Sequence, residues 1–277
     1  MPDAFLLLFG MGYVGTAVAR AAEAEGFGVV GVTRSTFAAV GPELARATHL
    51  LSTVPPDAAG DPVLACYADA IAAAPGLRWI GYLSTTGVYG DRGGGWVDET
   101  TEPAPASERS RRRLAAETEW RRFADRCAVD LFRLAGIYGP GRSAFEGLRG
   151  GMARRVSRPG HAFGRIHRDD IVRSGLAAMG QQRRPGARVL HLADDEPAES
   201  AEVVAEAARL LGVSAPQAVP FDQAWATMSP MARSFWAENR KVCSRRTQQA
   251  LGLRWRYPSY REGLRAILAE ERGEGAA

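Results

Sequence analysis

A glycine-rich turn between a strand and a helix is the feature that most constrains the fold of this chain. Residues 4–10, AFLLLFG, form an apolar run that predicts a buried strand of a parallel sheet. Residues 16–26, TAVARAAEAEG, have helical composition and end at a glycine. Between the two lies the GxGxxG sequence Gly10-Met11-Gly12-Tyr13-Val14-Gly15.

Each glycine of this loop has its own expected role. Gly10 permits the tight turn, Gly12 lets backbone N–H groups approach a pyrophosphate, and Gly15 lets the helix pack closely on the strand. The amino terminus of the helix then faces the phosphates. All six residues of the loop are therefore predicted to bind a dinucleotide cofactor.

The end of the next strand indicates which dinucleotide is bound. An Asp or Glu at this position would bind the ribose 2′-hydroxyl of NAD. Residues 27–35, FGVVGVTRS, end instead in Thr33, Arg34 and Ser35. A cation and two hydroxyls favour a 2′-phosphate, so NADP is predicted as the cofactor rather than NAD. The alternative is that Arg34 begins a solvated loop.

Strands and helices alternate along the rest of the amino-terminal half. Apolar runs that predict strands occupy residues 48–56, 78–90 and 129–141, and helical patterns occupy residues 61–74 and 107–127. This alternation predicts right-handed crossovers and a parallel sheet. We therefore expect an α/β fold, a Rossmann-type doubly wound parallel sheet with a smaller carboxyl-terminal substrate lobe.

The same pattern suggests domain boundaries. We place the nucleotide-binding core at residues 1–155 and the substrate lobe mainly at residues 156–277, with residues 163–195 returning to the core sheet. Ligands of open α/β sheets lie at the carboxyl ends of the strands. The strand predicted from residue 48 onward ends there in a proline loop. We expect three residues of this loop to contact the cofactor: Thr53, Val54 and Pro55.

Composition narrows the classes of function. No apolar stretch approaches the roughly 20 residues that span a bilayer, and the acidic start of the chain lacks a cleavage signal, so we expect a cytoplasmic protein. Cys66, Cys127 and Cys243 lack CxxC spacing, so neither disulfides nor a metal site is predicted. Lys241 is the only lysine beside many arginines, which makes the pI of about 9.2 weak support for nucleic-acid binding.

Four linked motifs resemble a known family. They are STTGVYG at residues 84–90, LAAE at 114–117, FRLAGIYGPGR at 132–142 and RIHRDDI at 165–171. In this order they resemble the extended short-chain dehydrogenase/reductases, the NAD-dependent epimerase/dehydratase group. The resemblance covers roughly residues 4–195. The glycine pattern departs from the usual TGxxGxxG of the group, which indicates an atypical branch.

The resemblance implies a catalytic Ser or Thr at a strand end and a Tyr-x-x-x-Lys pair on the following helix. Thr85 fits the first role, but alignment at LAAE places Arg109 at the tyrosine position and Arg113 at the lysine position. No tyrosine of the chain has Lys at the fourth following position. Since arginine stays protonated, it can polarise a carbonyl or bind an anion but cannot shuttle a proton.

Helical periodicity predicts which of the clustered arginines point inward. At about 100° per residue, six residues share the apolar stripe of this helix. They are Arg109, Arg113, Ala116, Trp120, Phe123 and Cys127. Arg109 and Arg113 should therefore face the sheet or the cleft above it, where a phosphate, a carboxylate or the cofactor ribose would neutralise them. The alternative is an internal salt bridge to Glu117 or Asp98. Arg111 and Arg112 should be solvated.

Without the tyrosine, another acid is needed for proton transfer. Tyr89 is the first candidate, because its loop should approach the nicotinamide; the alternative is a packed aromatic residue. His167 is the second, although a structural histidine beside Asp170 as helix N-cap is the simpler interpretation. Arg142 and Arg165 match positions that line the substrate cleft of the family, where nucleotide-sugar diphosphates are often held.

Two hypotheses of function follow. The first is an NADP-dependent oxidoreductase or epimerase-like enzyme acting on a small carbonyl or sugar-nucleotide substrate. The second is a non-catalytic NADP(H)-binding regulator or redox sensor. In both cases we expect a small-molecule ligand, which could be phosphorylated, and no nucleic-acid or membrane partner. The sequence leaves a homodimer open.

Overall fold

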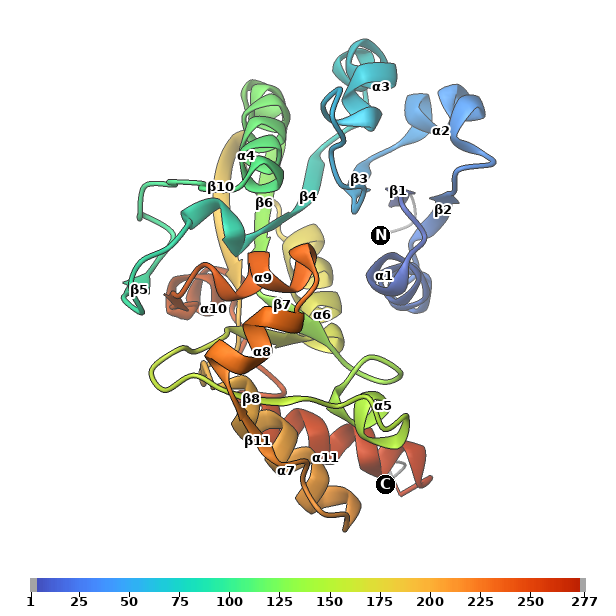
Figure 1. The fold of residues 1–277 in the computed structure, drawn as a ribbon. Helices are drawn as coiled ribbons and strands as arrows, with labels where there is room; N and C mark the ends of the chain where they lie inside the picture. Colours follow the sequence, from blue (N-terminus) through green and yellow to red (C-terminus); the bar gives the residue numbers. More distant parts are fainter. Residues whose placement is uncertain (1–3, 275–277) are drawn as a thin grey trace.

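A six-stranded parallel sheet forms the centre of the computed structural model, which describes residues 4–274 (Figure 1). The strand order is β2-β1-β3-β4-β6-β10, and every neighbouring pair is parallel. The prediction of a doubly wound parallel sheet is confirmed. The strands are β1 (Phe5–Phe9), β2 (Gly28–Val32), β3 (His49–Ser52), β4 (Trp79–Thr85), β6 (Ala128–Leu134) and β10 (Gly186–Leu192).

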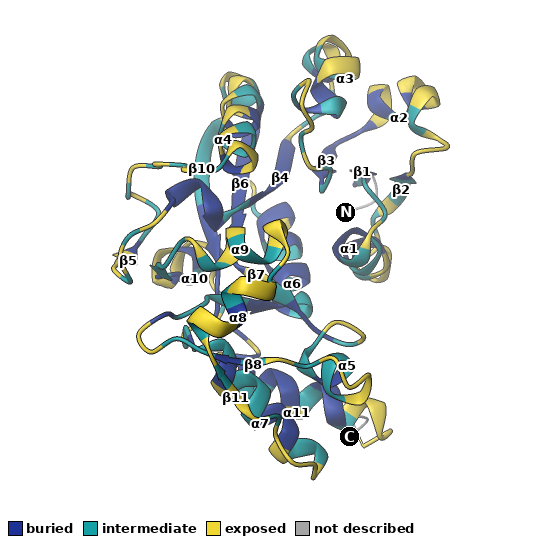
Figure 2. Ribbon diagram, in the orientation of Figure 1, coloured by how far each residue is buried: buried dark blue, intermediate teal, exposed yellow. Residues whose placement is uncertain are grey.

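Helices cover both faces of this sheet. On one face lie α1 (Tyr13–Ala24) and α6 (Arg168–Gly180), and on the other lie α2 (Gly41–Arg46), α3 (Pro62–Ala73) and α4 (Glu108–Arg121). Successive residues of β1 point to opposite faces, as the pleat requires. Leu6 and Leu8 pack under α1, whereas Leu7 and Phe9 pack on the other side. Figure 2 shows the resulting buried centre.

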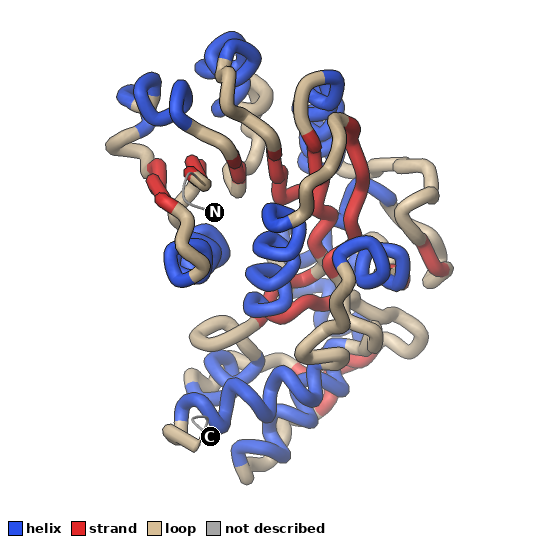
Figure 3. The backbone as a smooth tube through the Cα atoms, turned by 180° about the vertical axis from the view of Figure 1, so that it is seen from behind, coloured by secondary structure: helices blue, strands red, loops and turns tan. Residues whose placement is uncertain are grey.

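A smaller lobe packs beside the sheet and has a core of its own. Its helices are α5 (Ala144–Arg149), α7 (Ser200–Leu211) and α11 (Tyr260–Glu271) (Figure 3). The chain passes between core and lobe more than once. It enters the lobe at α5, before the predicted boundary at residue 155, and returns to the core sheet at β10, which pairs with β6. The lobe also holds β8 (Arg155–Ser157), β11 (Ala218–Pro220), α8 (Phe221–Thr227) and α9 (Pro230–Trp236).

Short elements connect the two parts. The strand pairs are β5 (Trp96–Val97) with β12 (Lys241–Val242), and β7 (Gly136–Tyr138) with β9 (Arg165–His167). The remaining elements are α10 (Arg245–Leu251) and three 3₁₀ helices, η1 (Phe37–Ala39), η2 (Thr86–Tyr89) and η3 (Arg122–Asp125). Within residues 4–274, no helix combines the length and hydropathy needed to cross a bilayer. The described residues also contain no cluster of His, Cys, Asp and Glu suited to a metal ion.

Candidate active site

The glycine loop links β1 to α1 in a conformation that requires two of its glycines. Gly10 has φ +94°, in the region that favours glycine, and a Cβ there would collide with Oγ1 of Thr53. A Cβ on Gly15 would collide with the carbonyl oxygen of Gly10. The third, Gly12, is the N-cap of α1, and a Cβ on it would meet nothing within 4 Å. No side chain caps α1, so its first N–H groups are open to an anion.

The end of β3 holds this loop in place. The Oγ1 of Thr53 donates a hydrogen bond to the carbonyl oxygen of Gly10 at 2.8 Å. Since the strand order reverses direction between β1 and β3, this contact lies at the topological switch point, where ligands of such sheets bind. Val54 follows half-buried against the core, and Pro55 is exposed.

The predicted 2′-phosphate residues follow β2 at the same edge of the sheet. Thr33, Arg34 and Ser35 are all exposed, and the hydroxyls of Thr33 and Ser35 are 2.9 Å apart. Within the described part of the chain, the Arg34 guanidinium makes no ion pair. These side chains are therefore accessible to a ligand bound along the carboxyl ends of β1 and β2.

A cleft of about 660 Å³ runs along the carboxyl ends of β1, β3, β4 and β6 and continues into the lobe, while Thr33, Arg34 and Ser35 lie outside its lining. It brings together most of the residues predicted from sequence. They are Gly12, Tyr13, Val14, Gly15, Thr53, Thr85, Arg109, Arg113, Arg142 and Arg165. The cleft also has walls that the sequence did not indicate, among them Ser110 on α4 and the segment Ser234, Phe235 and Glu238 around the end of α9.

Thr85 lies at the carboxyl end of β4, on the wall of the cleft. Its Oγ1 accepts a hydrogen bond from the N–H of Gly87 at 3.1 Å and so caps η2. Because this oxygen acts as an acceptor toward the backbone, its own O–H remains able to donate to a ligand.

Arg113 is fixed against the same strand end. Its Nη1 donates to the carbonyl oxygen of Leu83 at 2.9 Å and to the hydroxyl of Tyr82 at 3.0 Å. Among the described residues it forms no salt bridge with Glu117 or Asp98. The half-buried guanidinium therefore lines the cleft in the lysine position of the family pattern.

Arg109 differs from its prediction in burial. It lines the cleft but is exposed, and its guanidinium lies 6.0 Å from the ring centre of Phe235. The predicted apolar stripe is buried toward the carboxyl end of α4, at Ala116 and Trp120. Arg109 escapes burial because it lies in the first turn of α4, where the helix opens on the mouth of the cleft.

The arginines expected to be solvated are held by an acid of the same helix. Arg111 and Arg112 both pair with Glu108 at 3.1 Å on the surface of α4. Such exposed pairs contribute little to stability. The cluster of arginines thus divides into two residues at the cleft and two on the surface.

Tyr89 lies beneath the cleft rather than in it. Its side chain is fully buried, and its hydroxyl accepts a hydrogen bond from Nη1 of Arg133 at 2.7 Å. The same hydroxyl lies 2.5 Å from Nε2 of His191, whose Nδ1 faces the carbonyl of Cys243 at 2.9 Å. Since a carbonyl only accepts, Nδ1 carries the hydrogen and Tyr89 donates to Nε2. Burial raises the pKa of Tyr89 to about 12. The loop before Tyr89 lines the cleft, but its own side chain is a packed aromatic residue, the alternative interpretation.

The residues that bury Tyr89 were not indicated by sequence. Arg133 forms an ion pair of 2.6 Å with Glu117, and both side chains are buried. Glu117 also accepts a hydrogen bond from Oγ of Ser84 at 2.5 Å. This network connects the ends of β4 and β6 with α4, directly under the cleft.

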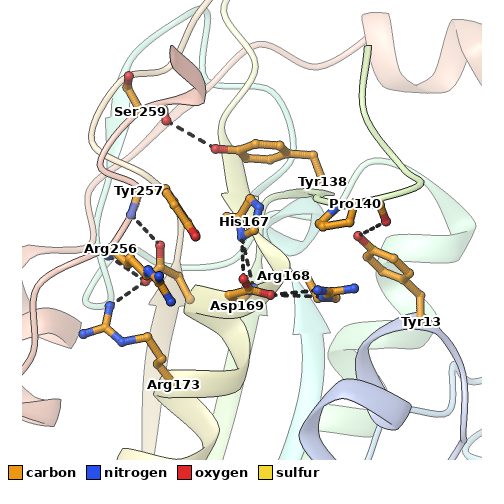
Figure 4. Close-up of polar contacts among 11 residues, drawn as sticks. Tyr13, Tyr138, Pro140, His167, Arg168, Asp169, Arg173, Arg256, Tyr257 and Ser259 are labelled. Carbon is orange, nitrogen blue, oxygen red and sulfur yellow. Dashed lines mark hydrogen bonds and ion pairs between the residues drawn. The ribbon is translucent and has the colours of Figure 1, made fainter. Parts of the chain in front are cut away.

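His167 is a structural histidine, the simpler of its two interpretations, and not an acid of the cleft. It is the N-cap of α6, with Nδ1 accepting from the N–H of Asp169 at 3.2 Å, and it is 1% exposed. Figure 4 shows its ring between Tyr138 and Tyr257. It does not line the cleft, so the expected substrate contact is not formed, because the end of β9 turns this side chain into the core. Burial lowers its pKa.

Asp170 is not the helix cap that the sequence suggested. Its carboxylate is fully buried and accepts hydrogen bonds from the backbone N–H groups of Arg256 and Tyr257 at 2.7 and 2.9 Å. Asp170 therefore attaches α6 to the segment that leads into α11.

The two predicted substrate arginines lie on the lobe side of the cleft. The guanidinium of Arg142 lies 5.7 Å from the ring centre of Tyr13, whose hydroxyl donates to the carbonyl of Pro140 at 3.0 Å. Arg165 donates from Nη1 to the carbonyls of Phe163 and Ala198 at 2.8 and 3.0 Å. Burial lowers the pKa of Arg165. The structure thus places one arginine at the glycine loop and one deeper in the lobe.

Comparison with curated proteins gives partial matches, and no protein-family model matches the chain. Protein YeeZ of Escherichia coli (strain K12) is 33% identical over 138 residues, 49% of this chain and 47% of that protein. The 3-diazoavenalumate denitrifying reductase of a Streptomyces species is 30% identical over 146 residues, 48% of this chain and 45% of that protein. The match spans about half the length of these curated relatives.

Solved structures match over nearly the whole chain. A conserved protein of unknown function from Silicibacter pomeroyi DSS has a TM-score of 0.86 and 43% identity, covering 97% of this chain and 99% of that one. The human epimerase family protein SDR39U1, solved with NADPH, has a TM-score of 0.78 at 20% identity and covers 95% and 98%. MoeE5, solved with UDP-glucuronic acid and NAD, has a TM-score of 0.76 at 21% identity and covers 98% and 100%. The last two likenesses concern the fold alone.

The fold defines the class of protein, one with the Rossmann-type fold that is also seen in the solved structures of SDR39U1 and of a UDP-N-acetylglucosamine 4-epimerase from Bacillus cereus. Within this class, the chain belongs to one family with the conserved Silicibacter pomeroyi protein.

Proposed function

We propose that this protein is an NADP-dependent oxidoreductase or epimerase-like enzyme that acts on a small carbonyl substrate. The observation that carries the proposal is the cleft of about 660 Å³ that joins the glycine loop to Thr85 and Arg113. A dinucleotide on the glycine loop and a substrate against the lobe would meet in this space.

The residues present fit a dinucleotide. The uncapped amino terminus of α1 and the open face of Gly12 suit a pyrophosphate. Arg34 and the hydroxyls of Thr33 and Ser35 would hold a 2′-phosphate at the end of β2. A bound nicotinamide would supply or accept the hydride. The NADPH found with SDR39U1 supports this choice of cofactor, although MoeE5 was solved with NAD.

The other proposed roles follow from geometry. The O–H of Thr85 would donate to the carbonyl oxygen of the substrate, because its oxygen already accepts from Gly87. Arg113, anchored to Leu83, would bind the nicotinamide ribose or an anionic group of the substrate. Arg109 at the mouth would polarise or neutralise a substrate without exchanging a proton.

A second candidate function is an NADP(H)-binding regulator or redox sensor. Two observations favour it. An arginine replaces the tyrosine that would transfer the proton, and Tyr89, the first substitute, is buried away from the cleft. The intact cleft and the two arginines on its lobe side favour the enzyme.

The test is a titration of the full chain with NADPH, NADP⁺, NADH and NAD⁺, followed by fluorescence and calorimetry. We expect both NADP forms to bind more tightly than the NAD forms. Arg34→Ala should remove this preference, whereas Arg20→Ala, an exposed arginine on α1, should leave it unchanged. Comparable binding of NADPH and NADP⁺ supports an enzyme that cycles between them.

Two other outcomes would change the proposal. Tight binding of one redox form alone would favour the regulator, and a partner protein would then be sought. No binding of any dinucleotide would overturn both functions, because both depend on the glycine loop.

A further inference from the structure

A smaller cavity adjoins the cleft on the lobe side, bounded by residues of α5, α7 and α11. We call it the side cavity. Its volume is about 220 Å³, and it shares Tyr138, Arg142 and Arg165 with the cleft. Drug-sized ligands occupy cavities of about 300–1,000 Å³. The side cavity is therefore sized for one end of a molecule whose remainder lies in the cleft.

Arg165 brings a charge to this cavity without a counter-ion. Among the described residues, no carboxylate lies within ion-pair distance of its guanidinium. Within residues 4–274 its hydrogen bonds use Nη1 alone, so Nε and Nη2 remain for a ligand. A half-buried cation without a partner is costly unless an anion joins it.

Asp194 is the buried acid that could have neutralised Arg165. Its side chain is 1% exposed, and neither carboxyl oxygen has a hydrogen-bond partner among the described residues. Burial raises the pKa of Asp194 well above its usual range, and the nearby charge of Arg165 acts in the opposite direction. Since no ion pair forms between the two side chains, the guanidinium of Arg165 keeps N–H groups for an incoming anion.

A second unpartnered group lines the same cavity. Tyr260 is 1% exposed, and within residues 4–274 its buried hydroxyl has no hydrogen-bond partner. A phenol in this state costs free energy that a bound acceptor would recover. The remaining walls include the apolar side chains of Val203, Val204 and Leu264. The cavity thus combines a cation, a hydroxyl donor and apolar walls.

We propose that the side cavity binds a compact anionic head group of the substrate, a carboxylate or a phosphate monoester. Arg165 is its counter-ion, Tyr260 donates a hydrogen bond to it, and Arg142 lies at its entrance. This inference rests on the proposed function, since it names the substrate class of the same site. It favours a small acid over a sugar nucleotide, because the side cavity has room for the head group alone and the remainder of the substrate would share the cleft with the cofactor.

The test is calorimetric titration of the full chain, with and without saturating NADP⁺, using inorganic phosphate, malonate and uridine diphosphate as probes. We expect saturable binding of phosphate or malonate, and the probe that binds identifies the head group. Arg165→Met should weaken binding about tenfold or more and Tyr260→Phe roughly fivefold. Arg209→Met, an exposed arginine on α7 that pairs with Glu206, is the matched control and should bind as wild type.

Three outcomes would overturn the inference. The first is that all variants bind the anions with equal affinity. The second is that the protein binds NADPH but neither phosphate nor malonate. The third is that uridine diphosphate binds far more tightly than phosphate and that this binding depends on Arg165. If Arg165→Met does not fold, Tyr260→Phe decides, because it removes a single oxygen. Failure to bind NADPH would instead overturn the proposed function. The anion titration without NADP⁺ does not depend on cofactor binding, so it tests the side cavity even in that case.

Discussion

Arg113 donates a hydrogen bond to the carbonyl oxygen of Leu83 at 2.9 Å, which fixes an arginine of α4 to the end of β4 beside Thr85. The contact explains how an arginine can occupy the position where the resemblance led us to expect a lysine. A planar guanidinium can bond the backbone with one nitrogen and present its other N–H groups to a ligand.

Removal of this guanidinium should weaken cofactor binding. For Arg113→Met we expect roughly tenfold lower NADPH affinity, measured by fluorescence titration, because one charge-assisted contact is lost. Arg112→Met is the control, since Arg112 pairs with Glu108 and does not line the cleft. Equal affinities of the two variants would show that Arg113 serves the fold alone.

The glycine loop offers a pair of substitutions that separate folding from binding. Gly15→Ala would drive a methyl group into the backbone of Gly10, so we expect a loss of about 1–3 kcal/mol in the free energy of unfolding and loss of dinucleotide binding. Gly12→Ala meets open space and should fold as wild type, but its methyl group would obstruct the pyrophosphate. Urea unfolding and NADPH titration measure the two effects. Normal NADPH binding by Gly12→Ala would place the phosphates elsewhere.

For Tyr89 we expect a substitution to lower stability without weakening cofactor binding. Tyr89→Phe removes the hydroxyl that bonds Nη1 of Arg133 and Nε2 of His191. The free energy of unfolding should therefore fall by about 1–3 kcal/mol. NADPH affinity should stay within about twofold of wild type, because the hydroxyl lies beneath the cleft. A folded variant with a complete loss of turnover on an identified substrate would restore Tyr89 as the proton donor.

The sequence predicted those parts of the site that depend on local backbone geometry. The glycine loop, Thr53 and Thr85 lie at strand ends, and strand ends of a parallel sheet meet at one edge whatever the packing. Helical periodicity likewise placed Arg113 at the cleft. It also placed Arg109 at the cleft, but it did not predict that Arg109 is exposed, because periodicity gives the direction of a side chain and not its burial.

Contacts between residues far apart in the sequence could not be predicted from the motifs. Tyr89 bonds Arg133 and His191, which lie 44 and 102 residues away, and no local pattern encodes these partners. The wall formed by Phe235 and Glu238 carries no motif and was missed for the same reason. His167 shows a related limit, since a histidine before a helix suits both a cap and a catalytic site until its surroundings are known.

His49 predicts how the stability of the protein depends on pH. Its side chain is 5% exposed, with Nε2 at 3.3 Å from the carbonyl of Met179 and Nδ1 at 2.8 Å from the hydroxyl of Thr48. Because the carbonyl accepts, Nε2 carries the single hydrogen of a neutral ring. Burial lowers the pKa of His49 from its ordinary value of 6.5 to about 4.

In the unfolded chain the His49 ring therefore becomes protonated near pH 6.5, whereas in the folded protein it stays neutral until about pH 4. Stability from this residue is complete above pH 6.5 and is lost as the pH falls through this window, by up to about 3 kcal/mol. His49→Gln should reduce the fall in the free energy of unfolding, measured with urea at several pH values between 7 and 4. The slope left in the variant reports the other shifted groups, which are the histidines whose pKa values burial lowers (His161, His167 and His191) and the aspartates whose pKa values burial raises (Asp61, Asp194 and Asp195). An unchanged slope in His49→Gln would mean that the ring is already protonated in the folded protein.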